Sequence, residues 1–199
     1  MGNKVNPLIY RANISNNWRS KWYTENKLAL NILLDFEIKK TIEAFISDKI
    51  PYEFYIERLE EIIIIVFLTP KRIPNSLKLS SLIEKIESKK CIINNVVSRS
   101  FLNSVSSLLH GIKKLILARK NYKAYISKFF YNSSYSNING IKIIISGRIN
   151  GIEIARKDIF CIGNISLIEL GQFYSYKTDF INTKYGVIGV KIYLSINQF

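Results

Sequence analysis

Residues 140–156 read GIKIIISGRINGIEIAR, and this stretch decides the fold of the C-terminal half of the chain. The β-branched run Ile141–Ile145 favours a strand. Gly147 and Gly151 frame the sequence S-G-R-I-N-G, which predicts a turn into a second strand at Ile152–Ala155. No Lys-Ser or Lys-Thr pair follows the glycines, so the stretch does not match the phosphate-binding loop of nucleotide hydrolases.

The residues before this stretch carry a long helical pattern. Apolar side chains recur at spacings of three and four from Val105 to Phe129, which predicts one long helix. Arg119 falls on the apolar stripe and Lys123 lies near its edge, so either the helix bends there or these side chains snorkel outward. The sequence leaves both open. The residues that project from the opposite side are basic: Lys113, Lys114, Lys120 and Lys128. Residues 132–139 predict a loop, and Val187–Ile196 predicts a further strand.

The N-terminal half mixes helix and strand patterns. The sequence predicts a helix at Leu28–Ile46, a hairpin of Phe54–Leu59 and Ile62–Leu68, a short helix at Ser80–Lys89 with Leu82, Ile83 and Ile86 inward, and a strand at Cys91–Val97. The fold class is therefore α+β. A boundary near Ser98–Asn103 divides the chain into an N-terminal extension at 1–34, a first domain at 35–100 and a second α/β domain at 101–199.

The distribution of charge points to a polyanionic partner. The 199 residues carry 29 Lys and Arg against 15 Asp and Glu, a net charge of +14. No carboxylate lies between Glu87 and Glu153, whereas eleven basic residues do. Such a stretch favours nucleic acid first and an anionic membrane surface second. The longest strongly apolar run, Ile62–Leu68, is too short to cross a bilayer as a helix, so we expect no membrane partner.

Little in the sequence points to catalysis or to a metal. The only histidine, His110, lies in the helical pattern without a partner that would form a catalytic pair. Cys91 and Cys161 belong to no zinc or disulfide motif. The acidic residues Glu53, Glu57, Glu60 and Glu61 favour a solvent or protein contact, because strand alternation points them in different directions. We therefore expect no enzyme activity and no cofactor. Most aromatic residues are better explained as core residues. Stacking on nucleic-acid bases is a less favoured role that we consider for three tyrosines of the basic stretch, Tyr122, Tyr125 and Tyr131.

Several stretches, taken in order, carry a family resemblance. They are MGNKVNP at residues 1–7, Arg11 with residues 18–22, YIER at 55–58, residues 140–156, and YGVIGVK at 185–191. In this order they resemble the small-subunit ribosomal protein S three (uS-three) family. The resemblance covers essentially the whole chain and is weakest between Ile62 and Ser107. It implies an N-terminal degenerate type II KH domain followed by a second α/β domain.

The resemblance also implies a function and a set of contacts. It implies a structural constituent of the small-subunit head that binds small-subunit rRNA and neighbouring head proteins, and that helps line the channel by which mRNA enters. The residues expected to face mRNA are Lys113, Lys114, Arg119, Lys120 and Lys123. The residues expected to contact rRNA are Lys4, Arg11, Arg19, Lys142, Arg148 and Arg156. The alternatives are a free-standing RNA chaperone or regulator and, less favoured, an RNA-modifying enzyme.

One departure from the family and one feature of the composition bear on the expected function and origin. A KH domain grips the nucleic-acid backbone through a GxxG loop, but no glycine lies between Gly2 and Gly111, and residues 69–80 read TPKRIPNSLKLS. We therefore do not expect this domain to bind single strands directly. The excess of Ile, Asn and Lys is typical of an AT-rich genome. With no leader peptide evident, we expect an organellar protein, of a plastid such as an apicoplast, with a mitochondrion or a reduced-genome bacterial cytoplasm as alternatives.

Overall fold

The chain folds into two compact units. The computed structural model describes residues 5–12, 18–46, 50–133 and 138–196. The N-terminal unit comprises residues 18–101, and the C-terminal unit comprises residues 102–199 together with 1–17. The segment 1–34, expected as one extension, is thus divided between the units. In the described part of the chain, no helix is both long and apolar enough to span a membrane.

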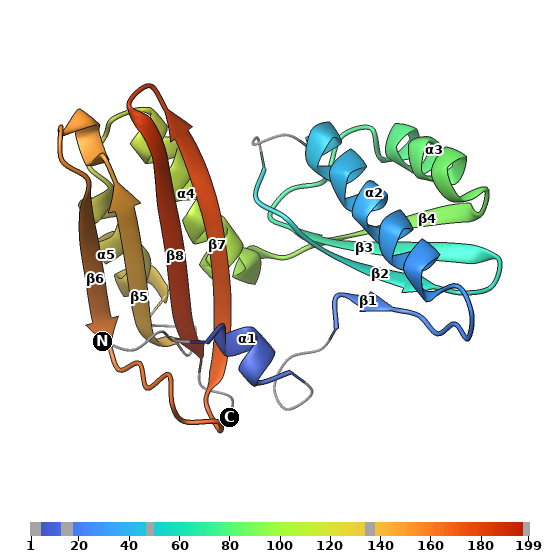
Figure 1. The fold of residues 1–199 in the computed structure, drawn as a ribbon, viewed down its shortest axis with the longest axis horizontal. Helices are drawn as coiled ribbons and strands as arrows, with labels where there is room; N and C mark the ends of the chain where they lie inside the picture. The colour runs from blue at the N-terminus through green and yellow to red at the C-terminus, as the bar shows by residue number, and fades with distance from the viewer. Residues whose placement is uncertain (1–4, 13–17, 47–49, 134–137, 197–199) are drawn as a thin grey trace. The chain divides into compact units, whose positions relative to one another are not determined.

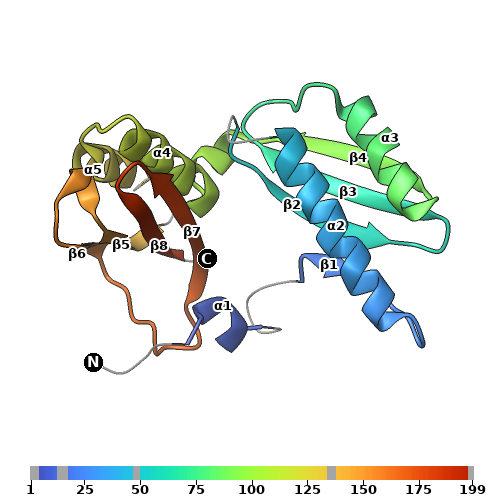
Figure 2. The same cartoon turned by 45° about the horizontal axis from the view of Figure 1, so that its top comes forward.

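The N-terminal unit is a four-stranded sheet with two helices on one face (Figure 2). Its elements are β1 (Ser20–Lys21), α2 (Leu28–Ile46), β2 (Glu53–Arg58), β3 (Ile62–Thr69), α3 (Ser76–Glu87) and β4 (Lys90–Val97). The strand order is β1-β2-β3-β4, in which only the β2–β3 pair is antiparallel. The predicted hairpin and the predicted strand at Cys91–Val97 are therefore confirmed.

The core of this unit follows from the alternation of β3. Ile63, Ile65 and Phe67 are fully buried, whereas the residues between them are half-buried. Burying each such side chain contributes about 1.5–3 kcal/mol. Helix α2 covers them with Ile38 and Ile42, but its first half leaves apolar residues exposed. Helix α3 begins four residues earlier than predicted and buries Leu79 with Ile83, while Leu82 faces outward.

A buried charge network ties both helices to the sheet. The Arg58 guanidinium on β2 lies 2.6 Å from an Asp35 carboxylate oxygen on α2 and 2.5 Å from a Glu87 oxygen on α3. The Trp22 indole donates to the other Asp35 oxygen at 2.9 Å. Burial raises the pKa of Glu87, and the charge of Arg58 opposes that rise.

The C-terminal unit is an antiparallel sheet covered on one face by two helices (Figure 1). Its elements are α1 (Pro7–Tyr10), α4 (Val105–Leu117), α5 (Tyr122–Ser133), β5 (Ile138–Gly147), β6 (Arg156–Gly163), β7 (Phe173–Thr183) and β8 (Gly186–Ile196). The strand order is β6-β5-β8-β7. The core forms where Leu108 and Ile112 of α4 and Ile126 of α5 pack against Ile143 and Ile192. The mixed α+β architecture is thus confirmed.

The long helix predicted from Val105 to Phe129 is broken in the structure. Helix α4 ends at Leu117, and Arg119 adopts a left-handed conformation with φ of 54°. The Lys120 amide donates to the Leu115 carbonyl and the Arg119 amide to that of Ile116, at 2.9 and 3.1 Å. This is the Schellman pattern that ends a helix. The chain therefore turns at Arg119, and α5 begins at Tyr122.

The strand predicted at Ile152–Ala155 is wrong. After β5 the chain forms a short 3₁₀ turn at Ile149–Gly151, and β6 begins only at Arg156, which pairs with Gly147. Ile154 is 80% exposed, so this apolar side chain does not lie on the buried face of a strand. The strand β7 has no counterpart among the predicted elements, whereas β8 lies where a strand was predicted. The predicted loop at 132–139 falls partly outside the described residues, and α5 extends to Ser133.

Candidate nucleic-acid interface

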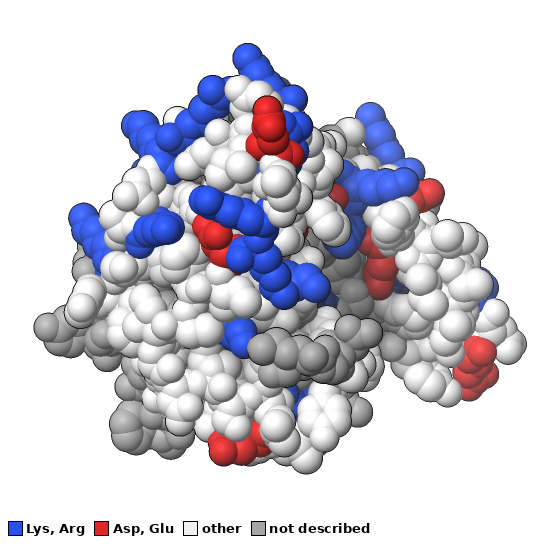
Figure 3. Space-filling view, turned by 60° about the vertical axis from the view of Figure 1, so that its left-hand side comes forward, with Lys and Arg blue, Asp and Glu red and all other residues white. Residues whose placement is uncertain are grey.

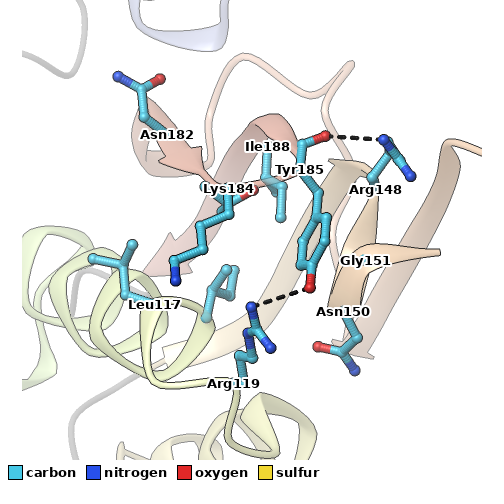
Figure 4. Close-up of a pocket in the computed structure, with 11 residues that line it drawn as sticks. Leu117, Arg119, Arg148, Asn150, Gly151, Asn182, Lys184, Tyr185 and Ile188 are labelled. Atoms are coloured by element: carbon cyan, nitrogen blue, oxygen red, sulfur yellow. Dashed lines mark hydrogen bonds between the residues drawn. The ribbon is translucent and has the colours of Figure 1, made fainter. Parts of the chain in front are cut away.

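Three turns meet at one end of the C-terminal unit and line a cavity of about 450 Å³ (Figure 4). The α4–α5 turn contributes Arg119. The turn between β5 and β6 contributes Arg148 and Asn150, and the β7–β8 hairpin contributes Lys184 and Tyr185. These side chains lie far apart in the sequence, and the antiparallel sheet brings them together.

Tyr185 holds two guanidinium groups at this cavity. Arg119 Nη2 donates to the Tyr185 hydroxyl at 3.2 Å, and its Cζ lies 5.2 Å from the ring centroid. Arg148 Nη1 donates to the Tyr185 carbonyl at 3.4 Å, and its Cζ lies 5.9 Å from the same centroid. Figure 4 shows the ring standing between the two arginines. The cation–π geometry attracts both charges to the ring.

The turn sequences explain this arrangement. Gly151 has φ of 82°, and a Cβ there would come within 2.9 Å of the Tyr185 ring, so only glycine fits without a shift. Arg148 Nε donates to the Ile152 carbonyl at 2.8 Å and closes the turn. On the hairpin, the Thr183 hydroxyl donates to the Gly186 carbonyl at 2.7 Å. Three contacts therefore fix Tyr185: Arg148 at its backbone carbonyl, Arg119 at its hydroxyl and Gly151 beside its ring.

The cavity is positively charged. Arg119, Arg148 and Lys184 line it, and no Asp or Glu is found among the described lining residues. Figure 3 shows Lys and Arg side chains gathered in the upper part of the view, with some Asp or Glu side chains among them. Cations that lie together without carboxylates attract a polyanion and release its counterions on binding.

The residues expected to face mRNA are mostly exposed near this end. Lys114, Arg119, Lys120 and Lys123 are exposed, and Lys123 Nζ lies 5.7 Å from the Phe160 ring centroid. Lys113 differs, because it is half-buried and its Nζ lies 3.8 Å from an Asp179 oxygen on β7. Within the described residues, β7, a strand distant in sequence, therefore supplies an acidic partner to this carboxylate-free stretch.

The residues expected to contact rRNA are scattered. Arg148 lies at the cavity, and Arg156 is exposed with its Nε 3.4 Å from an Asp158 oxygen. Lys142 is half-buried on β5, and Arg19 is exposed in the N-terminal unit. Lys4 lies outside the described residues.

Arg11 differs most from its expected role as an rRNA contact. It is fully buried, and its guanidinium donates to the carbonyls of Leu167 and Glu169 at 3.0 and 2.5 Å. Its Cζ lies 4.6 Å from the centroid of the Tyr174 ring. This guanidinium therefore anchors α1 inside the protein and is not available to RNA at the surface.

The three tyrosines considered for base stacking differ in how far they are exposed. Tyr122 is 4% exposed, and its hydroxyl donates to an Asp158 oxygen at 2.9 Å. Burial, with that hydrogen bond, raises the pKa of Tyr122 to about 12. Tyr125 is half-buried, and Tyr131 is 73% exposed.

Tyr185 was missed as a site residue, although it begins the motif YGVIGVK. Its basic neighbours become visible only when the structure places the three turns together.

No metal centre accompanies this interface in the described part of the chain. The structure there brings together no group of three or more His, Cys, Asp or Glu side chains that could hold an ion. The chemistry that the arrangement offers is ionic and aromatic contact.

The comparisons with known proteins point to one family. The family model for ribosomal protein S3, C-terminal domain, matches residues 112–194. The small ribosomal subunit protein uS3 of Thermotoga petrophila is 30% identical over 202 residues, covering 98% of this chain and 97% of the relative. That of a Thermotoga species is 31% identical over 206 residues, with coverage of 98% and 97%. That of Borreliella burgdorferi is 32% identical over 211 residues, covering 98% of this chain and 70% of the relative.

The C-terminal match begins at Ile112 within α4 and includes α5 and the turns that line the cavity, and the relatives extend the similarity to nearly every residue. The chain belongs to the uS3 family of small ribosomal subunit proteins.

Proposed function

We propose that this protein is a structural constituent of the small-subunit head and that it binds rRNA by neutralising phosphates, with no catalytic step of its own. Its partners are small-subunit rRNA and the neighbouring proteins of the head. The observation that carries this proposal is the acid-free cavity flanked by Arg119, Arg148 and Lys184. Phosphate contacts from Lys and Arg supply affinity and register without reading sequence.

The exposed cations of the α4–α5 region are proposed to face mRNA and to help line the channel by which it enters. Lys114, Lys120 and Lys123 follow one another around a helix end and its turn, and all are exposed. The Arg119 turn redirects the chain there, so the cations spread over two helices. Point charges of this kind hold a moving polyanion without fixing its sequence.

The N-terminal unit is proposed to be a degenerate type II KH domain. Its element order α2-β2-β3-α3-β4, with β3 and β4 parallel, supports this proposal. A KH domain that binds single strands carries a GxxG loop, whereas here residues 70–75 join β3 directly to α3 and contain no glycine. We also propose that the protein acts in a plastid, on the composition alone.

Sedimentation tests the ribosomal assignment. The full chain, at physiological salt, is expected to migrate with the small subunit in stoichiometric amount. If it instead binds RNA but remains in the unsedimented fraction, the free-standing RNA chaperone is the better description. A product formed on rRNA in a single-turnover assay would support the RNA-modifying alternative.

Translation of structured messages tests the mRNA assignment. Replacing Lys114, Lys120 and Lys123 together with Gln should lower the yield from a structured message, relative to an unstructured one, by severalfold. The matched control replaces Lys128, Lys157 and Lys191, which are exposed in the same unit and remove the same charge. Equal yields from the first variant and the parent would rule out the mRNA role.

A further inference from the structure

We propose that the cavity beside Tyr185 accommodates one unstacked RNA nucleotide, with its base against the Tyr185 ring and its phosphate among the surrounding cations. The identity of the polymer rests on the proposed function, whereas the pocket for a single nucleotide goes beyond it. The argument depends on the support of the ring, the floor of the cavity, its charge and its rim.

The Tyr185 ring is a supported stacking surface. Gly151 lies so close to it that an added Cβ would touch the ring, and Arg119 holds its hydroxyl. The side chain is still 41% exposed and borders the cavity (Figure 4). An aromatic side chain that is already fixed loses little conformational entropy when a base stacks on it.

The cavity combines an apolar floor with a polar rim. Ile116 and Ile188 line its base and are almost fully buried. Asn150 and Asn182 also line the cavity and are exposed, and a side-chain amide carries donors and an acceptor of the kind that pair with the edge of a base. A volume of about 450 Å³ is within the range for small-molecule sites. A flat planar group therefore fits this surface better than a phosphate alone would.

The cations complete the nucleotide site. Arg119 and Lys184 reach the cavity from opposite connections, and Arg148 stands beside the ring (Figure 4). A phosphodiester satisfies these donors, while its attached base covers the aromatic wall. An acidic peptide would satisfy the charges but would leave the tyrosine face without a planar partner. The geometry therefore favours RNA over an acidic protein segment.

Fluorescence of a stacked base tests the proposal directly. The probe is a short oligouridylate with a central 2-aminopurine ribonucleotide, added to the full chain. Stacking on Tyr185 should quench the probe. Tyr185→Leu should abolish the quenching and weaken binding by about tenfold or more, whereas Tyr185→Phe should retain the quenching. Tyr10→Leu removes an exposed tyrosine of the same unit that does not line the cavity, and it should change neither.

The salt dependence of binding separates the charge contribution from stacking. Arg119→Gln and Lys184→Gln should each reduce the slope of log affinity against log salt by about 1, whereas Tyr185→Leu should leave the slope unchanged. Lys128→Gln is the matched control for charge, because Lys128 is exposed and outside the cavity. Inorganic phosphate alone should compete weakly, since it cannot cover the ring.

Two outcomes distinguish the pocket from the proposed function. Retained quenching and affinity in Tyr185→Leu, with a parent-like circular dichroism spectrum, would overturn the pocket even if the chain sediments with the small subunit. Loss of sedimentation, with Tyr185-dependent quenching intact, would overturn the ribosomal assignment and leave the pocket in place. Tighter binding of an acidic peptide than of the oligouridylate would also overturn the nucleotide proposal.

Discussion

At the scale of single residues, Arg119 shows a conflict between stability and binding. It occupies the left-handed position that ends α4, with φ of 54°, a position that glycine usually fills. A side chain there costs about 1–2 kcal/mol. The same side chain reaches Tyr185 and the cavity. Strained backbone conformations are found most often at functional sites, and the strain at Arg119 is consistent with a role of its side chain in binding.

The Arg119 strain has a measurable consequence. Arg119→Gly and Arg119→Ala both remove the charge, but only glycine relieves the backbone. The glycine variant should therefore have the larger free energy of unfolding, by about 0.5–1 kcal/mol after its greater entropy in the unfolded chain is counted. Urea unfolding followed by circular dichroism measures the difference. Equal stability of the two variants would show that the turn is not strained.

At the scale of elements, the Tyr122–Asp158 contact joins α5 to β6. Burial raises the pKa of the Tyr122 hydroxyl to about 12, whereas an unfolded tyrosine ionises near 10. Its contribution to folding is therefore complete below about pH 10 and is lost as the pH rises from 10 toward 12. The first turn of α5 should loosen from the sheet in that range.

Tyr122→Phe tests this contact. The variant should be less stable than the parent at neutral pH by about 1 kcal/mol, because the hydrogen bond from the Tyr122 hydroxyl to the Asp158 carboxylate is lost. It should also lose less stability than the parent between pH 10 and 12, which thermal unfolding across that range measures. Tyr131→Phe, on the same helix, is the control. A parallel decline in parent and Tyr122→Phe would contradict the assignment.

Local patterns predicted many elements but not the long-range pairings. Leu28–Ile46 matches α2 residue for residue, because its helical spacing needs no distant partner. A bend at Arg119 was one of two alternatives that the sequence left open. It could not be chosen because α4 and α5 both pack on the same sheet face, so the apolar periodicity continues across the break. No glycine or proline marks that turn.

The candidate site was only partly predictable for the same physical reason. Arg119 and Arg148 were expected from charge and resemblance, but their meeting at Tyr185 depends on the register of β5, β7 and β8. The same register places Asp179 against Lys113. The burial of Arg11 could not be predicted, because the sequence does not reveal that its guanidinium donates to the carbonyls of Leu167 and Glu169.

At the scale of the whole molecule, the two units have separate cores and different electrostatics. The N-terminal unit buries Arg58 in ion pairs with Asp35 and Glu87, so this arginine stabilises the interior of the unit. The C-terminal unit places Arg119, Arg148 and Lys184 at an exposed cavity. Both tryptophans of the chain, Trp18 and Trp22, belong to the N-terminal unit, so their fluorescence reports on that unit alone.

This separation predicts that stability and binding can be altered independently. Arg58→Ala leaves two carboxylates without their buried partner, which should lower the free energy of unfolding of the N-terminal unit by about 3–5 kcal/mol. Urea unfolding followed by tryptophan fluorescence measures this loss, because the Trp22 indole donates to the same Asp35. Quenching of 2-aminopurine by Tyr185 should remain as in the parent, because each unit has a hydrophobic core of its own. If Arg58→Ala removes the quenching as well, the cavity depends on the N-terminal unit, and the two units act as one cooperative body.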